Sequence, residues 1–479
     1  MPRPLLLVLL LASACVAEAK PGDEQWFTVL LDGRKIGQFE STREVHDDRV
    51  TTRQSMQLEL DRAGTRIAMS STETSEETRD GRPLAFSNVS FMAGSETVVE
   101  GRVENGEVIA RFRNAGATSE RRFAWPEGAV LPEGQRLALE RATLEDGEIR
   151  RELSFQPSSL DAVEITSTVG ARETVNLPSG RMKLTRIEQS FAFPGAAVRS
   201  TAWVDDQRDI RKLTMPALGV DLTLIECGKP CATAPNQSSD VFERTLVPSP
   251  RALTRTELAS GLRYTFAARD RGAPLHLADT AEQSVRANGS KLIVDVRRDA
   301  RSGVGGAPDA SDYAANDWLQ SRAPEIVDLA NGAVGAVEDD AERMQRLEQF
   351  VRGFIKDKNL GVGYASALEV ARKPEGDCTE HAVLLAALGR AVGIATRVVD
   401  GLGYAPNFAG AGDVFVPHAW VQAWVDGRWQ SYDAALAGFD AGHIAFSAGD
   451  GDPWRFYQGL DLLGRLKLER VEPLSGSAN

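Results

Sequence analysis

The chain has 479 residues, which is too many for one hydrophobic core, so the sequence predicts about two or three domains. The formal net charge is -13, from 68 acidic and 55 basic side chains that are spread along the chain. This balance argues against nucleic acid or an anionic membrane surface as a partner.

The N-terminus has the features of a secretory signal peptide. A short positive start is followed by an apolar run of about a dozen residues, too short to span a bilayer, and by the cleavage pattern Ala17-Glu18-Ala19. We therefore expect residues 1–19 to be removed and the mature chain to be periplasmic or secreted. The alternative is a lipoprotein that begins at Cys15, which is less favoured because Ala12 stands where such motifs prefer Leu. No later segment is apolar and long enough to anchor the protein.

Two of the three cysteines that follow the predicted signal peptide lie close together in the sequence, and the third lies far from them. Cys227 and Cys231 lie close together around a Gly/Pro turn, so in an oxidising compartment we expect a local disulfide between them. A metal site at this pair is not favoured, because no other ligands with suitable spacing lie nearby. Cys378 is left over from this pairing.

Residues 20–247 are predicted to form a β-rich domain, largely antiparallel. Apolar and polar residues alternate, and two-residue turn signals recur at Asp32-Gly33, Asp80-Gly81, Asn105-Gly106, Asp146-Gly147 and Ser179-Gly180. The only histidine of this region, His46, is expected to be an exposed strand residue. No phosphate loop, His/Cys cluster or close carboxylate pair marks a site, so we interpret the domain as a packing or recognition module.

A break at residues 248–250 begins a predicted linker with short strands over residues 248–309. After it the hydrophobic period becomes that of helices. A helix is predicted over about residues 339–357, with one apolar face made by Met344, Leu347, Val351, Phe354 and Ile355.

Two further helices are predicted before the sequence turns to strands. Ser366 opens a short helix that Pro374 closes, and the next helix begins at Asp377 or Cys378 and stops at Gly393. The stretches 394–399, 414–425 and 428–432 are apolar and rich in β-branched residues. Helices followed by an antiparallel sheet predict an α+β domain over residues 310–470, with a flexible tail at 471–479.

Cys378 is the candidate nucleophile. It stands in Glu-Gly-Asp-Cys-Thr-Glu-His, residues 375–381, at the predicted start of a helix. A cysteine attacks as the thiolate, and an ordinary thiol pKa of about 8.5 leaves little thiolate near neutral pH. A helix N-terminus and a neighbouring imidazole both favour the thiolate. The predicted position of Cys378 supplies the helix N-terminus.

The neighbouring imidazole is predicted from the register of two strands. Residues 417–425 alternate, which puts His418 and Trp420 on one face, and Asp426-Gly427 is a strong signal for a two-residue hairpin. With that hairpin Trp420 faces Asp433, so Asp433 lies on the face of His418, at the diagonal position. A carboxylate there can accept one ring N–H and leave the other ring nitrogen for the thiol.

The predicted site is therefore Cys378 as nucleophile, His418 as base and Asp433 as the carboxylate that orients the base. His381 is an alternative base, but a helical neighbour of the cysteine is better explained as a capping or packing residue. Trp420, Trp424 and Trp429 either wall off the site or form a hydrophobic face of the sheet.

Three stretches carry a resemblance to a known family. Residues 376–397, followed by His418-Ala419-Trp420 and Ser431-Tyr432-Asp433, resemble the bacterial branch of the transglutaminase-like superfamily. The resemblance covers roughly residues 310–450, and the motifs occur in the expected order. It implies a papain-like α+β core with Cys378, His418 and Asp433 as the catalytic triad, preceded by the large β region.

The resemblance also implies a chemistry: acyl transfer on amide bonds of a protein or peptide through a thioester at Cys378. A primary amine as acceptor would make a cross-linking enzyme, and water an amidase or protease. The rival interpretation is a secreted binding or assembly module of the cell envelope that uses a silent core as scaffold. The backbone N–H of Cys378 is the natural oxyanion donor, and Tyr364 is one side-chain candidate. No cofactor or metal is expected, because the sequence contains no EF-hand type of calcium loop.

Overall fold

The computed structural model describes residues 24–62, 65–92, 95–114, 117–193, 196–217, 220–237, 245–269, 275–299, 301, 303–358, 364–451, 462–463 and 465–474. The predicted signal peptide, the lipoprotein alternative at Cys15 and residues 475–479 lie outside this part of the chain. The chain divides into two compact units, Met1–Asp61 with Arg66–Asp240, and Arg62–Thr65 with Val241–Asn479. Each unit is described separately.

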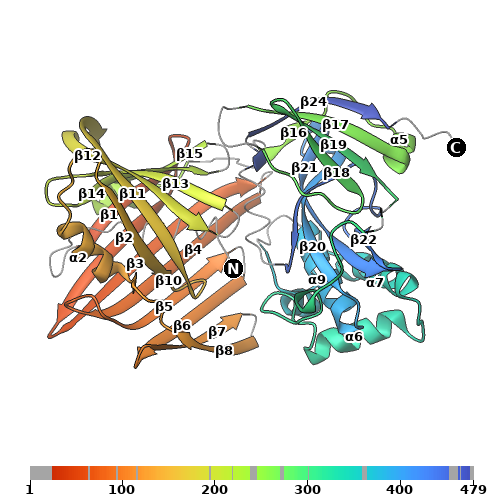
Figure 1. Ribbon diagram of the computed structural model, residues 1–479, viewed down its shortest axis with the longest axis horizontal. Helices are drawn as coiled ribbons and strands as arrows, with labels where there is room; N and C mark the ends of the chain where they lie inside the picture. Colours follow the sequence, from red (N-terminus) through yellow and green to blue (C-terminus); the bar gives the residue numbers. More distant parts are fainter. Residues whose placement is uncertain are drawn as a thin grey trace. The chain divides into compact units, whose positions relative to one another are not determined.

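The first unit is built on one large sheet that is antiparallel except at its edge, where β9 pairs with β10 in parallel (Figure 1). Its strands are β1 (Glu24–Leu31), β2 (Arg34–His46), β3 (Arg49–Arg62), β4 (Thr65–Thr78), β5 (Pro83–Met92), β6 (Ser95–Glu104), β7 (Glu107–Asn114), β8 (Ala117–Ala124), β9 (Ala129–Val130), β10 (Ile149–Gln156), β11 (Asp161–Leu177), β12 (Gly180–Phe193), β13 (Ala196–Val204), β14 (Ile210–Ala217) and β15 (Val220–Glu226). The helix α2 (Pro132–Glu140) lies between β9 and β10 in the chain.

Neighbours in this sheet are mostly neighbours in the chain, because short hairpins connect them. The strand order runs from β8 back to β1, crosses from β1 to β15, and continues from β15 back to β9. Asp32 and Gly33 have φ angles of 51° and 77°, and Asn105 and Gly106 have 51° and 78°. Positive φ at both turn residues defines the type I′ hairpin, so the signals at Asp32-Gly33 and Asn105-Gly106 act as predicted. At Asp80-Gly81 and Asp146-Gly147 only the glycine has positive φ. His46 ends β2 with its side chain 78% exposed.

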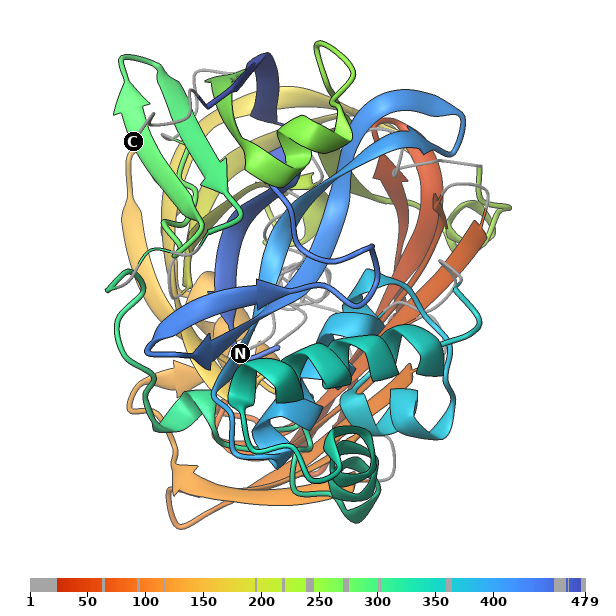
Figure 2. The ribbon, with the colours of Figure 1, turned by 90° about the vertical axis from the view of Figure 1, so that its right-hand side faces the viewer.

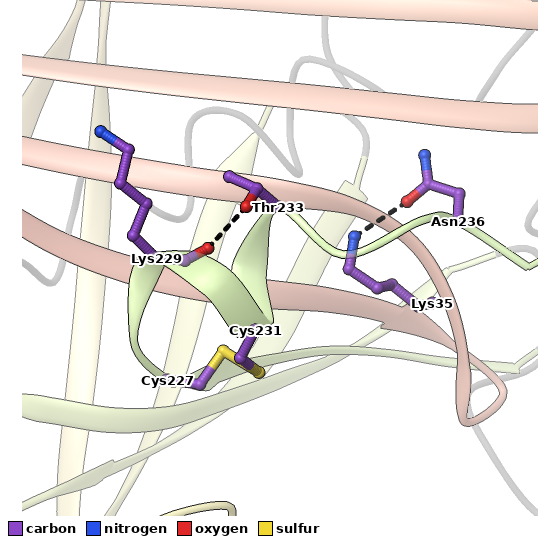
Figure 3. Close-up of a disulfide and its surroundings, with 6 residues drawn as sticks. All are labelled: Lys35, Cys227, Lys229, Cys231, Thr233 and Asn236. Atoms are coloured by element: carbon purple, nitrogen blue, oxygen red, sulfur yellow. Dashed lines mark hydrogen bonds between the residues drawn. A yellow bond between two sulfur atoms is a disulfide. The ribbon is translucent and has the colours of Figure 1, made fainter.

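The predicted disulfide is present. Cys227 and Cys231 are bonded across the short helix α3 (Lys229–Ala232), which follows β15 (Figure 3). Next to it, Thr233 donates a 2.8 Å hydrogen bond to the carbonyl of Lys229. This cross-link closes a small loop at the end of the sheet.

The second unit contains two sheets and a group of helices. One sheet has the order β16 (Val247–Pro248), β21 (Ala411–Val425), β20 (Thr396–Phe408), β23 (His443–Gly449), with β22 (Arg428–Tyr432) paired to β21. The other has the order β18 (Gln283–Asn288), β19 (Lys291–Arg297), β17 (Gly261–Ala268), β24 (Leu466–Pro473). The helices are α5 (Arg255–Ser260), α6 (Pro324–Val334), α7 (Asp340–Phe354), α8 (Ala367–Arg372) and α9 (Cys378–Ala391), with a 3-10 turn at Ala310–Asp312.

One hydrophobic core joins the two sheets of this unit. Tyr264 and Phe266 of β17 are fully buried against Phe415 of β21 and Leu402 of β20. On another side of the unit, α9 packs on β20 and β21, and α6, α7 and α8 pack on α9 (Figure 2). Almost every side chain of α9 is buried, as expected for a central helix.

The α+β prediction is confirmed, and so are the three helices. In α7 the predicted apolar face is buried at Met344, Leu347 and Val351. In α8 the capping box at Ser366 forms as predicted, and Gly393 has a φ of +85° after the end of α9. None of the helices in the described part of the chain is long and apolar enough to cross a membrane.

The observed strands differ from the predicted linker and tail. The stretch 248–309 contains β17, β18 and β19, which form a sheet with β24, so this stretch is built into the second unit. Residues 471–473 belong to β24 and pair with β17 rather than forming a tail. The pairing of β17 with β24 accounts for the position of residues 471–473 and ties the stretch 248–309 to the end of the chain. These partner strands lie about two hundred residues apart, where no local pattern reports the pairing.

Candidate active site

Cys378 is the first residue of α9, and a capping box sets this start. The side chain of Asp377 accepts the N–H of Thr379 at 3.0 Å, and Glu380 accepts the N–H of Asp377 at 2.8 Å. These bonds satisfy N–H groups that a helix start leaves without intrahelical partners. The predicted position of the cysteine at a helix tip is therefore observed.

Gly376 is required just before this turn. Its φ of +137° is one that side-chain-bearing residues rarely adopt, and an added Cβ would overlap the Cγ of Glu380. Its N–H donates a 2.9 Å bond to the carbonyl of Asp357, which anchors the loop before Cys378 to the segment after α7.

The hairpin β21–β22 has the predicted register. Val425 faces Arg428 and Trp424 faces Trp429. The turn residues Asp426 and Gly427 have φ angles of 52° and 73°, which is again the type I′ geometry. Asp433, the residue directly after β22, thereby lies on the face of the sheet that His418 occupies.

His418 and Asp433 are in direct contact. Nε2 of His418 lies 2.8 Å from Oδ2 of Asp433, and the two residues are 3% and 1% exposed. A buried carboxylate at this distance fixes the tautomer and orientation of an imidazole. Because Nε2 is the nitrogen that binds the carboxylate, Nδ1 is the ring nitrogen that could serve a reacting group.

The carboxylate of Asp433 is held from several directions. Its Oδ1 accepts the N–H groups of Ala435 and Leu436 at 2.8 and 3.1 Å. Helix α7 fixes its backbone, because Glu348 accepts its N–H at 2.9 Å and Arg352 donates to its carbonyl at 2.8 Å. Burial by itself would raise the pKa of this carboxyl, but the adjacent imidazoles override burial and hold the pKa well below its usual range. Asp433 is therefore ionised.

A second imidazole contacts the same carboxylate oxygen. Nε2 of His443, on β23, lies 2.9 Å from Oδ2 of Asp433, and its Nδ1 lies 3.2 Å from Oδ1 of Asp440. Burial lowers the pKa of His443, but the hydrogen bonds to the two carboxylates outweigh burial and raise the pKa to about 9. His443 is thus an imidazolium at neutral pH, with both ring nitrogens engaged.

His443 is a site residue that the sequence does not predict. Histidine is rare in this chain, with five in all, and that scarcity was the one available signal. The contact requires that β23 pair with β20, and this pairing contains a register shift between Asp400 and Gly401. A shift of that kind cannot be read from alternation.

Aromatic rings enclose the two imidazoles. Trp420 stacks on His418 with ring centroids 6.1 Å apart and meets His443 edge-on at 5.2 Å, and Phe439 lies 4.9 Å from His443. Trp424 and Trp429 instead pack against each other, beside Ala281 and Ala395. Of the three tryptophans weighed from the sequence, only Trp420 contacts the site residues, and the other two form a hydrophobic cluster of the sheet.

The first turn of α9 is tied to the turn that carries Asp433. Lys358 follows Asp357, the anchor of the loop before Cys378, and donates a 3.2 Å bond to the carbonyl of Ala435. Ala435 in turn binds the Asp433 side chain. The charge of Asp433 also acts on His381, one turn along α9, where it opposes the lowering of the pKa by burial. These links place the helix start and the Asp433 turn at the same end of the unit.

Two other residues considered from the sequence have different roles. Nδ1 of His381 binds the carbonyl of Asp377 at 2.6 Å, and burial lowers the pKa of His381. An imidazole held by its own helix turn lacks a carboxylate to orient it as a base. The hydroxyl of Tyr364 donates to the carbonyl of Gly451 at 3.0 Å, so its proton is not directed at an oxyanion.

Within the described residues, His418, Asp433 and His443 are the group whose ligand atoms lie close enough to hold a metal ion, all within 4.8 Å of one another. Their geometry is that of hydrogen bonds, because both Nε2 atoms point at one carboxylate oxygen. A metal-binding imidazole must also give up a proton, and the raised pKa of His443 opposes this. The arrangement therefore fits a proton-transfer site better than a metal site.

The comparison with protein families agrees with this geometry. Residues 327–434 match the family described as the transglutaminase-like superfamily. This segment is a transglutaminase-like domain, and it includes Cys378, His418 and Asp433. No curated protein matches the chain.

Several solved structures match part of the chain at low identity. A proposed cysteine protease from Cytophaga hutchinsonii is 16% identical over 45% of this chain and 84% of its own, with a TM-score of 0.27. A proposed protease from Parabacteroides distasonis is 12% identical over 75% of this chain and 69% of its own, with a TM-score of 0.21. A beta-barrel-like protein of a domain of unknown function from Brucella abortus is 11% identical over 44% of this chain and 98% of its own, with a TM-score of 0.36.

Proposed function

We propose that the second unit is a transglutaminase-like cysteine enzyme that transfers acyl groups from amide bonds through a thioester at Cys378. The observation that carries the proposal is the buried 2.8 Å contact between His418 and Asp433, in the same domain as a cysteine at a helix tip. The match of residues 327–434 to the transglutaminase-like superfamily supports it.

Each residue has one role in the proposed reaction. The thiolate of Cys378, favoured by the start of α9, attacks the carbonyl carbon of a carboxamide or peptide. The backbone N–H of Cys378 stabilises the oxyanion. The C–N bond then breaks, and His418 gives its proton to the departing amine. An acceptor, either water or a primary amine, loses a proton to His418 and attacks the thioester, which releases the thiolate.

His418 is assigned as the base because it keeps a ring nitrogen for the thiol. His443 uses both nitrogens on carboxylates. His381 also keeps one nitrogen, Nε2, but its Nδ1 binds a backbone carbonyl of its own helix, so no carboxylate orients its ring. Asp433 is assigned as the orienting group, since it binds Nε2 of His418 and stays ionised.

Alkylation tests the nucleophile and the base together. At pH 6 a thiolate paired with His418 reacts with iodoacetamide, and His418→Ala should slow the labelling of Cys378 about tenfold or more. His276→Ala is the matched control, because His276 is an exposed histidine of the same unit. Slow labelling that is the same in all three proteins would contradict the enzyme and favour the silent binding or assembly scaffold.

The mass of the peptide product identifies the acyl acceptor. The full-length mature protein is incubated with a glutamine-containing peptide, with and without a labelled primary amine. Incorporation of the amine identifies a cross-linking enzyme, and addition of water identifies an amidase or protease. A peptide of unchanged mass under both conditions, with rapid alkylation of Cys378, would restrict the substrate to another class of amide.

We also propose that the protein acts outside the cytoplasm, on a protein or peptide of the cell envelope. The bond between Cys227 and Cys231 supports this location, because disulfides persist in oxidising compartments. Fractionation of cells and N-terminal sequencing of the mature protein test it. Recovery of the full-length chain from the cytoplasm, with both thiols reduced, would exclude it.

A further inference from the structure

Two imidazoles on different strands share one carboxylate oxygen. His418 lies on β21 and His443 on β23, and both Nε2 atoms approach Oδ2 of Asp433, at 2.8 and 2.9 Å. The ring centroids of the two histidines are 5.4 Å apart. The carboxylate of Asp433 therefore links the proposed base, His418, to a second imidazole, that of His443.

The strand between them leaves the space that this arrangement needs. β20 pairs with both β21 and β23, and it places Gly401 opposite His418 and Gly403 opposite His443. A Cβ on Gly403 would lie 3.0 Å from the ring of His418, and a Cβ on Gly401 would meet the carbonyl of Ile444. Glycine at both positions lets the imidazoles approach each other above the middle strand.

His443 is built to carry charge and not to transfer a proton. Its 2% exposed side chain is held between Asp433 and Asp440, and Phe439 and Trp420 cover its ring. Both ring nitrogens are engaged, so no lone pair is left for a substrate. Among the described residues, the titratable groups that face it are Asp433, Asp440 and His418.

We propose that His443 is a positioning residue of this active site: its imidazolium binds the same carboxylate oxygen of Asp433 as His418, fixes the orientation of the carboxylate and reduces the negative field that the base experiences. This inference rests on the proposed function, because the base it adjusts is His418. It adds a fourth group, one that acts through Asp433, to the predicted triad.

The consequence is a shift of the pH profile. The ring centroids of His443 and His418 are 5.4 Å apart, so the positive charge of His443 repels positive charge on the base, and its removal should stabilise the ion pair between the Cys378 thiolate and the base. In His443→Gln the high-pH limb of the alkylation or activity profile should move upward by about two pH units, the scale expected for charges about 5 Å apart at an effective dielectric constant of about 20.

Asp440→Asn provides a second variant, because it leaves all three buried groups in place. Asp440 is 37% exposed, binds Nδ1 of His443 and accepts the N–H of Gly442 through Oδ1, which asparagine retains. The loss of its charge should let His443 deprotonate at lower pH. The high-pH limb should therefore shift in the same direction as in His443→Gln, by a smaller amount.

The experiment measures pH profiles of Cys378 alkylation for the full-length mature protein and both variants, from pH 5 to 10. Nitrogen-15 labelling of the five histidines follows the His418 ring directly by NMR, in the same proteins and without any need for turnover. The proposal is supported if, in His443→Gln, the high-pH limb of the alkylation profile and the titration of the His418 ring both move to higher pH. Circular dichroism and melting temperatures establish that the variants are folded.

Two outcomes would overturn the inference. One is a folded His443→Gln whose rate falls equally at every pH, since a purely structural role scales the profile without moving it. The other is an unchanged His418 ring titration in both variants; if His443→Gln does not fold, Asp440→Asn decides alone. If the ring titration shifts while wild-type Cys378 shows no pH-dependent reactivity, the proposed function fails and the coupling of the two histidines stands.

Discussion

Asp433→Asn separates the charge of Asp433 from its shape. Asparagine fits the same space and still accepts the N–H groups of Ala435 and Leu436, but it places no negative charge beside the buried imidazolium of His443. Removal of one partner from a buried charge pair costs about 3 to 5 kcal/mol. We expect the free energy of unfolding of the second unit to fall by that amount near pH 6.5.

The loss should depend on pH with a defined sign. The pKa of His443 is raised from an ordinary 6.5 to about 9, so its protonation stabilises the folded state fully below pH 6.5, and this stabilisation is lost as the pH rises through 9. The interval corresponds to roughly 3 kcal/mol, at about 1.4 kcal/mol per pH unit. The stability gap between wild type and Asp433→Asn should therefore narrow by about 3 kcal/mol between pH 6.5 and 10.

Urea unfolding from pH 6 to 10 measures this gap, with the fluorescence of tryptophans such as Trp420 reporting the second unit. The difference between the two proteins is the relevant quantity, because other groups titrate in the same window. Glu380, whose pKa burial raises to about 8, is one of them and is common to both proteins. A gap that stays constant within about 0.5 kcal/mol over this range would refute the charged state assigned to His443.

Three further outcomes are expected. Gly403→Ala should push the imidazole of His418 out of position and slow alkylation of Cys378 at pH 6 at least tenfold, whereas Gly412→Ala, in the same pair of strands but with no atom closer than 4.0 Å to the new Cβ, should have no effect. Gly376→Ala should disrupt the capping box and lower the melting temperature, with a cost of about 1 to 2 kcal/mol. Cys231→Ser should destabilise the first unit by about 2 kcal/mol, the value for closing so short a loop, and should leave alkylation of Cys378 unchanged.

Local features of the site could be predicted from the sequence because each depends on a few neighbouring residues. Asp377 and Glu380 define where α9 begins, and the Asp-Gly turn after Val425 defines the register that brings Asp433 to the face of His418. Capping and tight-turn geometry act over about four residues. The same reasoning predicted the turns between β1 and β2 and between β6 and β7 in the first unit.

Contacts between distant strands could not be predicted in this way. His443 reaches Asp433 only because β23 pairs with β20 across a register shift, and β24 joins β17 although about two hundred residues separate them in the chain. The energy of such pairings comes from side chains that meet only in the folded core. Alternation along one strand therefore identifies its faces but not its neighbours.

The sequence by itself determined the helix tip that carries Cys378, the hairpin that pairs His418 with Asp433, and the disulfide between Cys227 and Cys231. The tertiary structure alone decided that a second histidine shares the carboxylate and that the predicted linker belongs to the second unit. The physical reason is the range of the interactions: hydrogen bonds of caps and turns close within a few residues, whereas packing across a sheet depends on which segments the whole chain brings together.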